Sequence, residues 1–215
     1  MLGDFAHRRL SENVVSGCDT WLSGGIACSR QALGERWLGR YLSAPVWRFA
    51  WAPRVLNDPS WWFGVLMPSV DAVGRYFPLL LLQPWPGAPS SGEHLRRLDA
   101  WYDDVEACAM SVLEPAATLT GFEAALASVA SPEFERRDEP VASIEIAEDQ
   151  IRIDIATAGS WLSLAPAVAM QAMLHASSGH SWWWTAGSGR DSTRVNRVAG
   201  LPAPERFSRM LEGEF

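Results

Sequence analysis

Tryptophan constrains the fold of this chain more than any other residue type, because 12 of its 215 residues are tryptophan. Two groups of them are adjacent in sequence, Trp61-Trp62 and Trp182-Trp183-Trp184. Both groups lie in runs typical of β-strands, where successive side chains point to opposite faces of a sheet. The sequence therefore predicts either a sheet that helices cover on both faces, or a sheet with one open face whose aromatic patch binds a partner.

Helical and strand patterns alternate along the chain. The first 45 residues have helical spacing, and we expect Gly24-Gly25 to interrupt the helix and Pro45 to end the next one. Strands are predicted at residues 46–51, 61–67, 76–83, 144–146, 151–155 and 181–185, and further helices at 95–112, 118–130, 161–174 and 204–211. In the strand at 46–51, alternation sets the three aromatic residues on one face and Val46, Arg48 and Ala50 on the other, and the strand at 61–67 is expected to be buried on both faces. Interleaving of this kind favours an α/β fold with a mixed sheet.

Some local features refine this prediction. We expect Ser69 to begin a single helical turn that Gly74 ends, and Pro78 within a strand indicates an edge position or a bulge. A charged stretch at residues 132–140 could separate two domains. The strands after it are too few to bury a core alone, so we expect a single domain over residues 1–215.

Charge and composition exclude several classes of function. The net charge of -7 gives no basic surface for nucleic acid. All 18 basic residues are arginine, which excludes a P-loop lysine, a Schiff base and a pyridoxal phosphate anchor. No apolar run approaches the roughly 20 residues that cross a bilayer, and the first residues lack the pattern of a secretory signal. Three cysteines without a Cys-x-x-Cys pair indicate reduced thiols in a cytoplasmic protein.

Known catalytic and metal-binding motifs are missing from the sequence. The four histidines lie apart, so we expect no metal and no cofactor. Gly187-Ser188-Gly189 lacks the Gly-x-Ser-x-Gly spacing of a serine hydrolase. One alternative stays open: the Gly187–Arg194 loop, flanked by His180 and containing Asp191, could bind an anion in a small hydrolase or ligand-binding domain.

Arg48 and Arg75 are candidate site residues: Arg48 lies within an otherwise apolar strand, and Arg75 follows the turn that contains Asp71. A buried guanidinium must be paired, and Asp71 is a possible partner for either arginine. Such a pair is either an ordinary structural ion pair or part of a polar patch used in recognition.

Several strings in the chain form a distinctive set. They are Gly3-Asp4-Phe5, Arg9-Leu10, Trp21-Leu22, Ser29-Arg30, Ala44 to Phe49, Gly64 to Asp71, Val73 to Leu79, Ser181 to Trp184 and Gly200-Leu201-Pro202. This set resembles the TagF family, accessory proteins of the bacterial type VI secretion system. The resemblance is dense over residues 3–79, thin over 85–175, and returns near the end.

The resemblance implies a three-layer α/β sandwich with helices on both faces of the sheet. It also implies a cytoplasmic, non-enzymatic regulator that represses the secretion system after translation by binding its forkhead-associated scaffold protein. A structural subunit of the apparatus is a further alternative, and the oligomeric state and the role of phosphothreonine stay open. The candidate partner-binding residues are Asp4, Arg9, Arg48, Ser69, Asp71, Arg75, Trp182, Trp183 and Trp184.

Overall fold

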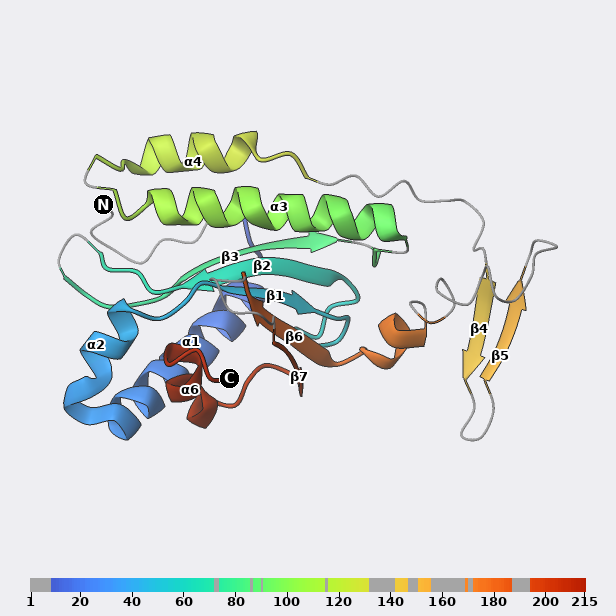
Figure 1. Ribbon diagram of the computed structural model, residues 1–215, viewed down its shortest axis with the longest axis horizontal. Coiled ribbons are helices and arrows are strands. Elements are labelled where there is room, and N and C mark those ends of the chain that lie inside the picture. The colour runs from blue at the N-terminus through green and yellow to red at the C-terminus, as the bar shows by residue number, and fades with distance from the viewer. Residues whose placement is uncertain are drawn as a thin grey trace.

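A five-stranded antiparallel sheet forms the centre of the structure (Figure 1). The computed structural model describes residues 9–71, 74–85, 87–89, 91–114, 116–131, 142–146, 151–155, 169, 172–186 and 194–215. The strands are β1 (Trp47–Trp51), β2 (Trp61–Met67), β3 (Leu79–Trp85), β6 (His180–Thr185) and β7 (Val195–Ala199), in the order β3-β2-β1-β6-β7. Strands β3 and β7 are therefore its edges.

The strand directions differ from the mixed sheet that the sequence predicts. All four neighbouring pairs in this sheet are antiparallel. Short connections link β1 to β2, β2 to β3 and β6 to β7, and such connections join antiparallel neighbours, whereas parallel neighbours need a longer crossover. The helices precede β1, lie between β3 and β6, which are not neighbours in the sheet, or follow β7.

Helices cover both faces of the sheet, as predicted, and confirm the α/β class (Figure 1). One face carries α1 (Glu12–Leu33), η1 (Gly34–Arg36), α2 (Trp37–Leu42), η2 (Pro204–Arg206) and α6 (Phe207–Leu211). The other face carries α3 (Gly92–Ser111), and α4 (Leu119–Ser128) packs beside it. No helix within the described ranges has both the length and the apolar character needed to cross a membrane.

Strand β1 separates two hydrophobic cores by simple alternation. Trp47, Phe49 and Trp51 join the core beneath α1, whereas Ala50 joins the core beneath α3. This is the division of faces that the sequence predicts for residues 46–51. Strand β2 is buried along its whole length, again as predicted.

Helix α1 runs without a break through Gly24-Gly25, where the sequence predicts an interruption. The glycines have a packing role. A Cβ atom on Gly25 would lie 2.5 Å from Cδ2 of Phe207, and one on Gly24 would lie 3.5 Å from Pro204 Cγ. Glycine therefore lets the C-terminal segment of the chain approach the helix closely.

Two further predictions need correction around β3. Ser69 does not begin a helical turn, because Val70 forms an antiparallel bridge with Tyr76 across a tight loop. Pro78 precedes β3 and does not lie within it, although the predicted edge position of this strand is confirmed.

The predicted strands near residues 144–155 form a separate hairpin of β4 (Ala142–Ile146) and β5 (Ile151–Ile155), which pair only with each other. The charged stretch at 132–140 and most of the predicted helix at 161–174 lie outside the described residues. The single-domain organisation stays a prediction.

Candidate functional site

A groove runs along the edge strand β3, with a volume of about 640 Å³. Its walls come from α4, from the start of α1 and from the loop that joins β2 to β3. The lining is mostly apolar and includes Val15, Leu22, Leu79, Leu80, Leu81, Leu82, Trp101, Val105, Phe122, Leu126 and Val129. A cavity of this size is within the range of known ligand pockets and apolar peptide grooves.

Four of the predicted site residues line this groove: Arg9, Ser69, Asp71 and Arg75. Arg75 Nε donates to Asp71 Oδ2, and the backbone N–H of Arg75 donates to Asp71 Oδ1 over 2.8 Å. The Asp71 carboxylate therefore fixes both the side chain and the backbone of Arg75, which confirms the predicted pairing of these two residues. Arg9 is exposed and has a φ of 61°.

Tyr41 anchors the loop that carries these polar residues. Its hydroxyl donates to the Ser69 carbonyl over 2.8 Å, and the Ser69 N–H donates to the Tyr41 hydroxyl oxygen over 3.0 Å. Burial raises the pKa of Tyr41 to about 12, which keeps the phenol neutral and able to donate. The polar end of the groove is thus held by α2.

The apolar part of the groove leaves hydrophobic side chains incompletely covered. Leu79, Leu80, Leu81 and Leu82 on β3 are all partly exposed, and α4 contains no fully buried residue. Edge strands are often protected from pairing by charges or proline; β3 carries no charge, and its proline, Pro84, lies near its end. An extended polypeptide added to an exposed edge gains backbone hydrogen bonds and places alternate side chains on its two sides. The groove therefore has the chemistry of a polypeptide-binding site.

Arg48 lies away from this groove, on the α3 face of β1. Its guanidinium contacts three carboxylates of α3: Asp99 at 3.5 Å, Asp103 at 2.6 Å and Glu106 at 2.8 Å. Burial by itself lowers the pKa of Arg48, but the hydrogen bonds to Asp103 and Glu106 overcome this and raise it. Asp71, the partner considered in the sequence analysis, pairs with Arg75 instead.

The tryptophan triplet is divided between the two faces of the sheet. Trp183 has 0% of its surface exposed and lies in the core beneath α1, against Trp21, Phe49 and Trp51. Trp182 and Trp184 lie on the α3 face and are half-buried. The structure thus buries one ring in the core and leaves two rings partly exposed, and whether these two bind a partner stays a prediction.

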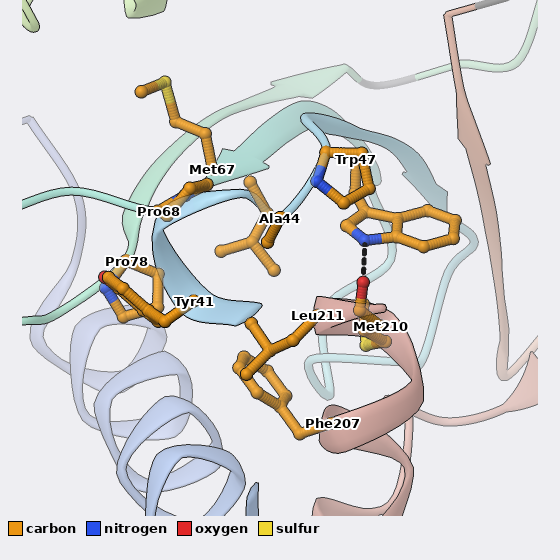
Figure 2. Close-up of a pocket in the computed structure, with 11 residues that line it drawn as sticks. Tyr41, Ala44, Trp47, Met67, Pro68, Pro78, Phe207, Met210 and Leu211 are labelled. Carbon is orange, nitrogen blue, oxygen red and sulfur yellow. Dashed lines mark hydrogen bonds between the residues drawn. The ribbon is translucent and has the colours of Figure 1, made fainter. Parts of the chain in front are cut away.

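A second, small cavity lies between α2, the end of β2 and α6 (Figure 2). Its volume is about 20 Å³ and its lining is apolar, including Tyr41, Trp47, Met67 and Phe207. Trp47 Nε1 donates to the Met210 carbonyl over 3.0 Å, so the polar atom at its wall is already satisfied. This volume is close to that of a single water molecule, so the cavity is a packing gap rather than a ligand site.

Two further predictions concern metal ligands and cysteine thiols. Among the described residues, no cluster of three or more His, Cys, Asp or Glu could hold a metal ion. Cys18 and Cys108 are buried, and burial raises the pKa of both thiols, that of Cys18 to about 12. Asp4 and residues 187–193 lie outside the described ranges. The predicted role of Asp4 and the alternative of a ligand-binding loop at Gly187–Arg194 are therefore not tested.

The sequence analysis missed several residues that shape these surfaces. Asp99, Asp103 and Glu106 recur at spacings of four and three, which places them along one face of a helix. That signal was present in the sequence, but nothing local shows that the face meets Arg48. The apolar stripe of α4 was missed for the same reason. The stripe is visible in the sequence, but only the tertiary structure places it beside β3.

The fold agrees with that of a known protein, and the sequence matches a known family. The chain matches the TagF N-terminal domain, described as type VI secretion system-associated, over residues 1–129. Its structure is similar to the crystal structure of PA0076 from Pseudomonas aeruginosa PAO1, with 37% sequence identity and a TM-score of 0.77. That similarity covers 97% of this chain and 89% of PA0076. No curated protein matches the chain significantly.

These findings define the class first: a type VI secretion-associated α/β domain with a helix-covered antiparallel sheet. Because the match covers more than half of the chain, the protein belongs to the TagF family.

Proposed function

We propose that the protein is a cytoplasmic negative regulator of a type VI secretion system. It acts after translation, without catalysis, by binding the forkhead-associated scaffold protein of that system. Membership of the TagF family supports the link to type VI secretion. The repression and the scaffold are the functions that the family resemblance implies.

The groove along β3 is the observation that carries this proposal. It combines an uncharged edge strand, an apolar wall from α4 and an anchored polar end at Asp71 and Arg75. These features suit the capture of an extended polypeptide segment better than the turnover of a small polar substrate. A regulator of this kind acts in proportion to its amount, so repression follows the level of the protein.

The direct test is calorimetric titration of the purified protein into the scaffold, in unphosphorylated and phosphorylated forms. We expect saturable binding with Kd near or below about 1 μM, which corresponds to roughly -8 kcal/mol. A difference between the two scaffold forms would show that phosphate gates the interaction. An absence of binding by both forms, with folded proteins, contradicts the proposal.

A pair of variants on α4 tests whether the groove is the site. Leu126 lines the groove, whereas Ala125 is exposed and does not line it. We expect Leu126→Arg to weaken scaffold binding by at least about tenfold, because it places a charge in an apolar contact. Ala125→Arg adds the same charge to the same helix and should leave the affinity within about twofold. Equal effects of the two variants would exclude the groove.

A further inference from the structure

Within the described part of the chain, the α3 face of the sheet is incompletely covered over its last two strands, β6 and β7. The strand register places Trp184 opposite Arg48 on one side and Val195 on the other. In the next row Trp182 lies opposite Arg197. Val195 has 54% of its surface exposed, and Arg197 is also exposed. This surface, formed by Arg48, Trp182, Trp184, Val195 and Arg197, is called the β6–β7 face below.

Carboxylates of α3 stand beside this face. Tyr102 of α3 contacts the ring of Trp184 at a centroid distance of 5.1 Å, and the Arg48 guanidinium lies 5.7 Å from the Tyr102 ring. Asp99 and Asp103, on the same helix, pair with Arg48 but keep 76% and 69% of their side chains exposed. With Glu106, three carboxylates meet the Arg48 guanidinium, and Arg197 is the second cation on this face, so an excess of one negative charge is left.

We propose that the β6–β7 face is a second docking surface, separate from the β3 groove, for a polypeptide segment that carries arginine. The negative excess of the α3 carboxylates complements a cationic segment. The half-buried rings of Trp182 and Trp184 offer aromatic surface to a guanidinium, and Arg197 already lies over the Trp182 ring at 5.8 Å. Arginine, tyrosine and tryptophan are the residues that contribute most to protein interfaces.

The test uses a defined probe, a pentapeptide of alternating arginine and glycine with blocked ends. Its citrulline twin keeps the shape of the side chains but removes their charge. We expect saturable binding of the arginine peptide to the full chain at low salt, measured by calorimetry, and a Kd for the twin at least about tenfold weaker. Equal binding of both peptides, or no binding of the arginine peptide, overturns the proposal.

A matched pair of variants locates the binding. Val195 on the β6–β7 face and Leu42 on α2 are both apolar and about equally exposed, at 54% and 55%, so substitution of either leaves the core intact. We expect Val195→Arg to raise the Kd of the arginine peptide about tenfold by like-charge repulsion, and Leu42→Arg to change it by less than about twofold. The same loss in both variants would show only non-specific attraction to an acidic protein and would overturn the proposal.

Two more variants separate this surface from the groove. The double variant Asp99→Asn, Asp103→Asn removes both exposed carboxylates and should weaken binding of the arginine peptide at least as much as Val195→Arg does. Asp104 lies on the same helix but does not pair with Arg48, so Asp104→Asn should leave the affinity for the peptide unchanged. Leu126→Arg should leave the arginine peptide bound. Loss of the peptide in Leu126→Arg would place the probe in the groove and overturn the proposal.

Discussion

The two faces of the central sheet differ in how completely they are covered. The α1 face buries Trp47, Phe49, Trp51 and Trp183 beneath helices from both ends of the chain. The α3 face is covered mainly by α3, which leaves Trp182 and Trp184 half-buried and β3 open to a groove. Adjacent tryptophans of one strand therefore serve different purposes, because strand alternation sends them to opposite faces. The more completely covered face holds most of the buried tryptophans, and the less covered face carries the surfaces that we propose for partners.

The largest expected difference in stability between the two faces concerns the tryptophan triplet, Trp182 to Trp184. We expect Trp183→Ala to cost about 3–5 kcal/mol of unfolding free energy, because it leaves a cavity among closely packed rings. Trp182→Ala removes a half-exposed ring and should cost about 1–2 kcal/mol. Urea denaturation followed by circular dichroism measures both. Equal losses would show that the two faces contribute alike to stability.

A smaller effect is expected at Arg48. Replacing it with methionine removes three ionic contacts, but Asp99 and Asp103 are exposed enough to regain water. We therefore expect Arg48→Met to cost about 2 kcal/mol, less than the loss of a fully buried pair. The same denaturation experiment applies. A variant as stable as the parent would mean that the ion pairs only offset the cost of burying the guanidinium.

The smallest expected effect is a pH dependence of stability caused by Cys18, and it tests whether the α1 face is as well buried as described. The pKa of Cys18 is about 12 in the folded chain, against an ordinary value of 9.0. Below pH 9 the thiol is neutral in both states, whereas above it only the unfolded chain loses the proton. Stability should then fall by about 1.4 kcal/mol per pH unit from the ordinary pKa towards the folded one.

Urea denaturation of the parent and of Cys18→Ala, between about pH 8 and pH 10, measures this slope. The range ends at the ordinary pKa of tyrosine, above which Tyr102, whose pKa burial raises well above 10.0, contributes a similar loss. The alanine variant should show a shallower slope between pH 9 and pH 10, where Cys108, whose pKa burial also raises, still contributes. An identical slope in both proteins would contradict a buried, neutral Cys18.

Much of the fold follows from local patterns in the sequence. The alternation of residues 46–51 predicts which side chains of β1 share a face, and the apolar stripe of residues 95–112 predicts α3, with both confirmed. Gly24-Gly25 shows where local reasoning fails. Glycine weakens an isolated helix, but here it permits contact with Phe207, 182 residues further along the chain. The cost to the helix is offset by close packing that no local pattern reveals.

The candidate site, too, is only partly predictable from the sequence. The family strings predict Arg9, Ser69, Asp71 and Arg75, and the structure brings these four to one groove. The partner of Arg48 was not predictable, because three carboxylates 51 to 58 residues away become neighbours only when α3 packs on the sheet. Whether these residues bind a partner stays a prediction for the experiments above.

The sequence by itself determined the α/β class, the helices and strands with the strongest periodicity, and the division of side chains between two faces, because these depend on interactions between residues close in the chain. Only the tertiary structure decided the strand order β3-β2-β1-β6-β7, which places β6 beside β1 and leaves β3 at an edge. Strand order depends on contacts between residues far apart in sequence, and on which apolar surfaces find cover. Those contacts also decided which tryptophans are buried and which surfaces stay open for partners.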